Sequence, residues 1–129
     1  MQEQIDRAAG WLTVLGRALL GLYFLIPGIS KIVGFEQNAA YMAEHQVPLI
    51  PVLLILTIIL QVGGGLALLA NFRTRLVAFV LAGLTLVISI YMHDFWNYAE
   101  GMERAHETQN FIKNLAIMAG LLTLTSRKT

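Results

Sequence analysis

The stretch "LGRALLGLYFLIPGISK", residues 15–31, decides the fold because it is mostly apolar and still carries two cations. Arg17 lies inside it and Lys31 lies at its end. The residues between them at steps of three and four are Gly21, Phe24 and Gly28. This spacing places all five side chains on one face of an α-helix, with the two cations about 21 Å apart along its axis. The stretch therefore predicts an apolar helix. One stripe of its surface, with a cation at each end, packs against another helix.

Composition indicates that this helix lies in a membrane. The chain has 129 residues, a length that predicts a single domain over residues 1–129. Hydrophobic residues make up 57% of it and charged residues only 13%, whereas soluble domains have about 25% charged residues. The net charge is +1 and no basic patch with interleaved aromatic residues is present, so nucleic-acid binding is not expected. The chain has no cysteine, which excludes disulfides, iron–sulfur clusters and Cys-ligated zinc.

Four segments are long and apolar. They are residues 11–33, 48–70, 76–92 and 111–125. The first two have the roughly 17–25 residues that cross a bilayer, and the last two need a turn from their polar flanks. A soluble helical bundle is the alternative, but its helices would show a polar face, which these hardly do. The sequence thus predicts an all-α, membrane-embedded four-helix bundle, with the lipid bilayer as its surroundings.

The arginines predict the orientation of these spans. Four crossings place both termini on one side. The cations on that side would be Arg7, Arg73, Arg75, Arg127 and Lys128, and those opposite would be Lys31, Arg104 and Lys113. Positive residues of short loops stay in the cytoplasm. We therefore expect a multi-pass protein with both termini cytoplasmic (N-in, C-in), a short interfacial helix within residues 34–48, and aromatic residues at headgroup level in residues 93–109.

Arg17 needs a partner within the bundle. An arginine that faces lipid near the membrane centre costs about 3 kcal/mol or more. Gln61 lies at a similar depth, counted from the cytoplasmic ends, and precedes the triplet "GGG" at 63–65, where backbones can approach closely. We expect Arg17 to hydrogen-bond Gln61 or a carbonyl near the glycines. The alternative is that Arg17 extends to the cytoplasmic headgroups.

Lys31 belongs to a second polar layer near the outer face. The side chains predicted to converge there as a ligand-binding site are Lys31, His93, Asp94, Trp96, Lys113 and Asn114. A Lys31–Asp94 ion pair is one interpretation, and a pocket with His93 as donor and Trp96 or Phe111 as wall is another. A polar cap that only fixes the helix ends is a third. Pockets in bundles form where a few polar groups converge between helices, and this layer supplies donors beside aromatic walls that suit a quinone.

No catalytic or metal site is predicted. The histidines at 45, 93 and 106 do not share a metal-ligand spacing. The chain shows no nucleophile–base pair, phosphate loop or dinucleotide fingerprint. We therefore expect no catalytic residue, no metal and no certain cofactor, and no enzyme activity for the chain on its own.

Five blocks of sequence together resemble the DoxX family. In order they are "GRALLGLYFLIPGISKIVGF", "YMAEHQVP", "GGGLALLANFRTR", "HDFW" and "QNFIKNLAIMAGLL", within about residues 14–123. The resemblance implies a small bacterial inner membrane protein with four helices. The positions that match its motifs are Arg17, Gly28, Lys31, Pro48, Gly64, Arg75, His93, Phe111, Lys113 and Asn114. Family members often carry a glutamate where this chain has Gln61, so an ion pair with Arg17 becomes a neutral hydrogen bond, which argues against proton coupling there.

Two function classes follow. The family's name comes from a relation to a subunit of thiosulfate:quinone oxidoreductase. The resemblance therefore implies a non-catalytic accessory or scaffold subunit of a respiratory or redox membrane complex, with a quinone at the outer polar layer. The other class is a small-molecule or ion carrier that acts as a homo-oligomer, with the Arg17–Gln61 layer as its site.

Overall fold

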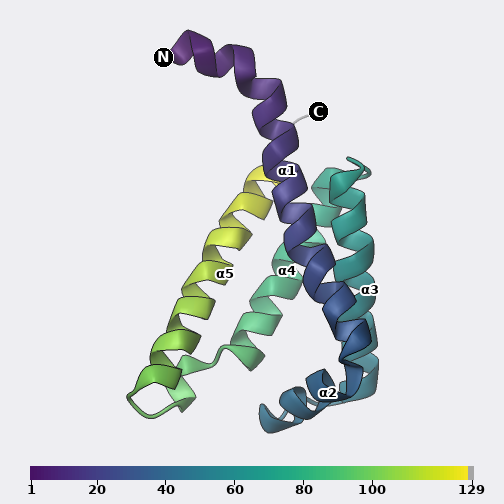
Figure 1. Ribbon diagram of the computed structural model, residues 1–129, viewed down its shortest axis with the longest axis vertical. Coiled ribbons are helices and arrows are strands. Elements are labelled where there is room, and N and C mark those ends of the chain that lie inside the picture. The colour runs from purple at the N-terminus through teal and green to yellow at the C-terminus, as the bar shows by residue number, and fades with distance from the viewer. Residues whose placement is uncertain (128–129) are drawn as a thin grey trace.

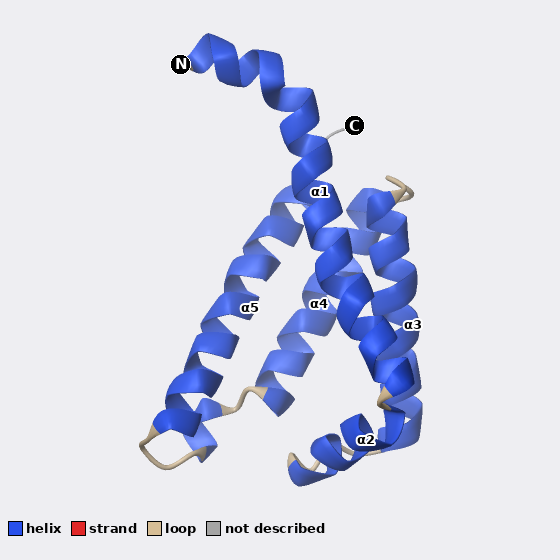
Figure 2. Cartoon of the chain, viewed as in Figure 1, coloured by secondary structure: helices blue, strands red, loops and turns tan. Residues whose placement is uncertain are grey.

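The computed structural model describes residues 1–127, and these residues are helical throughout except for turns (Figures 1 and 2). The helices are α1 (Gln2–Val33), α2 (Phe35–Glu44), α3 (Ile50–Leu69), α4 (Thr74–Met92) and α5 (Met102–Ser126), with a short 3₁₀ helix, η1 (Phe95–Asn97), before α5. The all-α fold class predicted from the sequence is confirmed.

The helices pack as two pairs. α1 packs mainly on α3, α4 packs mainly on α5, and α3 also contacts α4. The turn between α3 and α4 lies at the same end of the molecule as the start of α1 and the end of α5, and we call this the terminal end (Figure 1). α2 and η1 lie at the opposite end, which we call the α2 end (Figure 1). Each polar feature below belongs to one of these ends or to the interior between them.

Glycines make the contact between α1 and α3. A Cβ atom on Gly65 would lie 2.7 Å from the carbonyl oxygen of Gly21, and one on Gly21 would lie 2.8 Å from the carbonyl oxygen of Gly65. On the same face of α1, a Cβ on Gly28 would lie 2.8 Å from the Val62 side chain. Such distances leave no room for a side chain, and they let two backbones touch where lipid gives no hydrophobic drive for association. The close crossing predicted at the glycine triplet is confirmed at Gly65.

The core lies where α1, α3, α4 and α5 meet. Its buried residues are Phe24, Leu68, Ala78, Leu81, Ala82 and Leu121. Phe24 comes from the predicted stripe of α1, and the stripe's Gly21 and Gly28 are buried as well. Ala78 and Ala82 are four residues apart, so one small-residue face of α4 admits the larger side chains of its neighbours. The stripe read from residues 15–31 is thus the buried face of α1.

Three helices are long and apolar enough to cross a membrane. They lie in Gln2–Val33, Ile50–Leu69 and Thr74–Asn97. Large apolar side chains on their outer faces are exposed, among them Leu19, Ile26, Ile55, Ile59, Phe79 and Val87, as expected for faces that contact lipid. α5 has the length, but its first half carries Glu103, Arg104 and Glu107 and its apolar part is short. A fourth crossing by α5 stays a prediction, and so does the four-helix membrane bundle.

The short helix predicted within residues 34–48 is present at the α2 end, and its position at a membrane interface stays a prediction. α2 occupies Phe35–Glu44 within the segment 34–48, and Leu49, in the left-handed conformation at φ 50°, turns the chain into α3. The start of α1 and the end of α5 lie at the terminal end, which agrees with the expected topology without identifying the cytoplasmic side. The N-in, C-in orientation stays a prediction, and Lys128, one of the cations that support it, lies outside the described residues.

Candidate functional site

Arg17 faces α3 and bonds to its backbone. The Arg17 Nε donates a hydrogen bond of 2.8 Å to the carbonyl of Leu68. Two partners were expected for Arg17, namely Gln61 or a carbonyl near the glycines. The structure confirms the carbonyl. The Gly21–Gly65 contact sets the register of the antiparallel pair, so Arg17 is level with Leu68 and Leu69, while Gln61 is level with Gly28. The depth count failed because α1 extends well beyond the end of α3.

Gln61 is left without a partner for its carbonyl oxygen. Its side chain is buried, at 5% exposure. Within residues 1–127 the Gln61 Oε1 atom has no hydrogen-bond partner. A buried amide oxygen in this state costs about 1–3 kcal/mol. Arg17 and Gln61 therefore do not pair: Arg17 donates one hydrogen bond to a backbone carbonyl, and the Gln61 amide oxygen is left without a donor.

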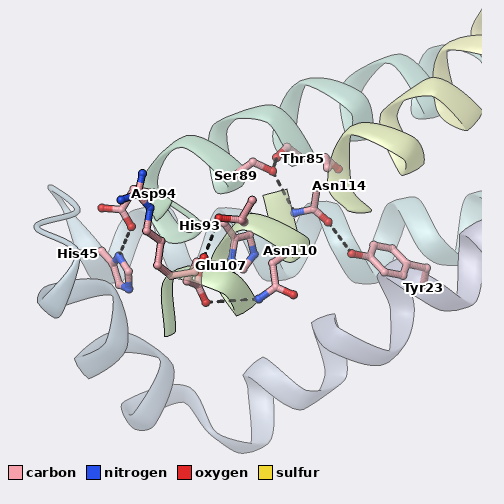
Figure 3. A network of polar contacts seen from close by, with 11 residues as sticks. Tyr23, His45, Thr85, Ser89, His93, Asp94, Glu107, Asn110 and Asn114 are labelled. Atoms are coloured by element: carbon pink, nitrogen blue, oxygen red, sulfur yellow. Dashed lines mark hydrogen bonds and ion pairs between the residues drawn. The ribbon is translucent and has the colours of Figure 1, made fainter. Parts of the chain in front are cut away.

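A chain of hydrogen bonds joins α1, α5 and α4 in the interior (Figure 3). The hydroxyl of Tyr23 donates to Asn114 Oδ1 at 2.8 Å, and Asn114 Nδ2 donates to Ser89 Oγ at 3.0 Å. Ser89 Oγ in turn donates to the Thr85 carbonyl at 2.8 Å. Asn114 is only 6% exposed and Ser89 is fully buried. Asn114 thus holds three helices together and does not belong to the layer where the sequence placed it.

Two histidine–carboxylate pairs form the polar layer at the α2 end (Figure 3). His45 Nδ1 lies 3.0 Å from Asp94 Oδ1, and His93 Nδ1 lies 2.8 Å from Glu107 Oε2. Asn97 and Asn110 donate to the remaining oxygens of the two carboxylates, at 2.8 and 3.3 Å. All four paired side chains are largely buried. Asp94 pairs with His45 and not with Lys31, one of the three interpretations of this layer, because α2 lies over this end of the bundle and carries His45 at its end.

The other residues of the predicted layer do not join these pairs. Lys31 is half-buried, and within residues 1–127 it makes no ion pair or side-chain hydrogen bond. Lys113 is exposed on the outside of α5. Trp96 is 48% exposed and packs edge-to-face with Phe95 and Phe111, at centroid distances of 5.2 and 5.7 Å. The aromatic wall is present, but of the six residues predicted to converge, His93 and Asp94 are taken up in the two carboxylate pairs, and Lys31 and Lys113 do not join them.

Sequence reasoning missed His45, Glu107 and Tyr23. Tyr41 and Tyr98 also pack near the His45 ring, at 4.8 and 6.5 Å between centroids. Burial, followed by the nearby Glu107 carboxylate, raises the pKa of both tyrosine hydroxyls above the usual range, so they remain protonated donors at neutral pH. The sequence did hold a signal for His45. This residue directly follows the short helix expected over residues 34–48, so a helix lying across this end of the bundle would bring His45 to the polar layer. Within the described chain no three His, Asp or Glu side chains cluster as a metal site would require.

An apolar groove runs between α3 and α4. It encloses about 370 Å³, and its walls include Leu56, Leu60, Gly83, Leu84 and Val87. Its rim at the α2 end consists of Met42, Val47 and Met92. Met42 and Val47 flank His45 in the chain, and Met92 precedes His93 and Asp94. The rim of the groove is therefore made by near neighbours in the chain of His45 and Asp94, although neither residue lines the groove itself.

The chain resembles known proteins over most of its length. The DoxX family profile matches residues 12–94. Inner membrane protein YqjF of Escherichia coli K12 is 38% identical over 111 residues, which cover 86% of this chain and 79% of that protein. Inner membrane protein YphA of the same strain is 27% identical over 113 residues, which cover 88% and 80% of the two chains. No solved structure matches the chain significantly. With this profile match and its long apolar helices, the chain is a membrane protein and belongs to the DoxX family.

Proposed function

We propose that the chain is a non-catalytic accessory protein of the bacterial inner membrane that binds a quinone. The isoprenoid tail would occupy the groove between α3 and α4, and the headgroup would lie at the His45–Asp94 pair. The observation that carries the proposal is that Met42, Val47 and Met92, near neighbours in the chain of the buried His45–Asp94 pair, line the rim of an apolar groove of about 370 Å³. This location differs from the one predicted from the sequence, since Lys31, Lys113 and Asn114 take no part in it.

The chemistry of the rim suits a quinone carbonyl. Such a carbonyl needs hydrogen-bond donors next to apolar walls. His45 Nδ1 contacts Asp94 Oδ1 at 3.0 Å, which leaves the second ring nitrogen as the hydrogen-bonding group offered to a headgroup. The Tyr41 and Tyr98 hydroxyls next to that ring supply further donors. The groove itself supplies the apolar surface that a tail of repeated isoprene units requires, at about 25 cal/mol per Å² buried.

Blocking the groove tests the tail site. Gly83 lines the groove, and a Cβ added there would meet no atom within 4 Å, so Gly83→Leu fills space without a clash at its own backbone. Gly83→Leu should weaken binding of decylubiquinone about tenfold and leave binding of a tail-less quinone unchanged. Gly16→Leu is the matched control, because Gly16 is also free of neighbours and lies on α1, outside the groove. Equal binding of decylubiquinone to Gly83→Leu and Gly16→Leu would refute the tail site.

The headgroup site has its own test. His45→Ala should weaken binding of the tailed and the tail-less quinone alike. It removes the ring that is proposed to hydrogen-bond the headgroup, and it leaves the lining of the groove unchanged. His106→Ala is the control, since His106 is an exposed histidine on α5. Quenching of tryptophan fluorescence reports binding in both series. If His45→Ala binds both quinones as the unaltered protein does, the headgroup lies elsewhere.

The accessory role rests on the family relation and on the proposed ligand. A quinone carries electrons between membrane enzymes, so a small non-catalytic binder would act beside a respiratory or redox complex. The relatives are named inner membrane proteins, which supports the same location for this chain. The proposed multi-pass topology with both termini cytoplasmic rests on the distribution of its arginines. Gentle solubilisation followed by affinity purification should recover a quinone-dependent oxidoreductase with the chain. Recovery of the chain free of any redox enzyme would argue against the accessory role.

The alternative, a carrier for a small molecule or ion that acts as a homo-oligomer, is favoured by one observation. Gln61 Oε1 is buried and unsatisfied in the described part of the chain, close to the α1–α3 crossing. A transported group that donates a hydrogen bond would satisfy it. Flux in proteoliposomes that depends on a counter-ion and is lost in Gln61→Leu would favour the carrier over the accessory protein.

A further inference from the structure

A small pocket at the terminal end is lined by three arginines. It encloses about 210 Å³ between the first part of α1, the α3–α4 turn and the end of α5. Its polar lining residues are Arg17, Arg75, Arg127, Thr13, Asn71 and Thr74. These residues lie far apart in the sequence, so the fold itself brings three cations to one space.

Each arginine is held in place by a single hydrogen bond. Besides the bond from Arg17 Nε to Leu68, Arg75 Nε donates to the Thr125 carbonyl at 2.8 Å and Arg127 Nη1 donates to Thr13 Oγ1 at 2.7 Å. A guanidinium has five N–H donors. The bonds that fix these side chains therefore use one donor of each and leave most of their N–H groups for another acceptor.

No carboxylate neutralises this cluster within residues 1–127. The ion pairs of the described chain are Arg7–Glu3, His45–Asp94 and His93–Glu107, and none involves a pocket arginine. The pocket's polar lining consists otherwise of hydroxyl and amide groups. Three like charges around one small space repel one another, and an anion between them removes that repulsion. Arginine forks match the oxygens of phosphate with paired hydrogen bonds.

We propose that this pocket binds a phosphate-type oxyanion. The anion would lie between the guanidinium groups of Arg17, Arg75 and Arg127, within reach of the Thr13 and Thr74 hydroxyls. Basic pockets between membrane helices are suited to the headgroups of anionic phospholipids. Inorganic phosphate offers the same oxygens without a lipid tail. Both sources share one chemistry, and the experiment separates them.

The test uses the full chain, purified and stripped of lipid in neutral detergent. One series adds phosphatidylglycerol or, for comparison, zwitterionic phosphatidylcholine, and the other adds inorganic phosphate at constant ionic strength. The rise of the thermal unfolding midpoint with concentration gives an apparent Kd in each. Arg127→Gln should raise that Kd about tenfold, which corresponds to about 1.4 kcal/mol, and Arg75→Gln should do the same. Arg127 contacts only an exposed hydroxyl, so its variant keeps the fold intact.

Arg73→Gln is the matched control. Arg73 lies close to Arg75 in the chain but does not line the pocket. Its Cζ atom lies 5.6 Å from the centroid of the Phe72 ring. The Arg73→Gln variant therefore removes the same charge without changing the pocket. It should leave the apparent Kd within twofold of the unaltered protein. Stabilisation by phosphatidylglycerol alone identifies a lipid headgroup as the ligand, and stabilisation by inorganic phosphate as well identifies a site open to the free anion. No stabilisation by either anion, or equal loss in Arg73→Gln and Arg127→Gln, overturns the proposal.

Discussion

Gly65→Ala tests whether the α1–α3 crossing holds the fold together. The new Cβ would lie 2.7 Å from the Gly21 carbonyl oxygen and 2.8 Å from the Leu25 backbone nitrogen. Both are backbone atoms and cannot rotate away, so the helices must separate by roughly 0.5–1 Å, which forfeits a quarter to a half of the dispersion energy at the contact. Overpacking of this kind destabilises by about 1–3 kcal/mol. Separation would also lengthen the bond from Arg17 to Leu68, which lies one turn away.

Gly63→Ala provides the matched comparison for this prediction. Gly63 belongs to the same triplet, and a Cβ there would meet nothing within 4 Å. That variant gains helix propensity, up to about 1 kcal/mol in water. Equilibrium unfolding in mixed micelles with increasing dodecyl sulfate should therefore rank Gly63→Ala at or above the unaltered protein and Gly65→Ala below it, by about 1–4 kcal/mol between the two. Equal stability of the two variants would show that α1 does not cross α3 at these glycines.

Three further predictions concern the polar groups. Asn114→Leu leaves the Tyr23 hydroxyl and Ser89 without their partner, and we expect a loss of about 0.6–2 kcal/mol in the same unfolding assay; Lys113→Leu, on the exposed side of α5, should change stability far less. Arg17→Leu should destabilise the α1–α3 pair by about 1.5–3 kcal/mol through loss of a charged hydrogen bond to a carbonyl, and an unchanged unfolding curve would indicate that Arg17 extends to headgroups instead. A reporter fused to the C-terminus should be active only as a cytoplasmic reporter, and a periplasmic signal would reverse the orientation.

The sequence was sufficient for the features that depend on local pattern. The stripe through Gly21, Phe24 and Gly28 predicted the buried face of α1 because helical spacing is fixed by geometry. The interfacial helix before Pro48 followed from periodicity in the same way. The glycine triplet predicted a close crossing, although only Gly65 makes it against α1, since three consecutive residues point to different sides of a helix.

What failed was the register between helices. Of the two partners expected for Arg17, the carbonyl near the glycines is confirmed and Gln61 is not. Gln61 follows only from counting from the ends of apolar segments, and those ends do not mark where two helices cross. The contact of Gly21 with Gly65 places Gln61 near Gly28 instead. Asp94 was paired with Lys31 by depth alone, while the fold of α2 over the bundle gave it His45. Which side chains from distant segments meet depends on how far one helix is shifted along the other. The periodicity of a single helix carries no information on this shift.

The separation of the two proposed sites yields a last prediction, which distinguishes an accessory protein from a carrier. Along α4 the arginine pocket lies at Thr74 and the groove rim at Met92, about 27 Å apart. Gly83, the groove position to be substituted, lies nine residues from Thr74, about 14 Å along the helix. In a rigid bundle, substitutions more than about 10 Å apart with no shared partner act additively within about 0.5 kcal/mol. Gly83→Leu combined with Arg127→Gln should then lower quinone and anion binding each by the amount seen in the single variants. A carrier must couple its two ends, because opening one end closes the other, so in a carrier Arg127→Gln would alter quinone affinity by itself. Additive binding data would therefore support the accessory protein, and a coupling of several-fold between the ends would favour the carrier.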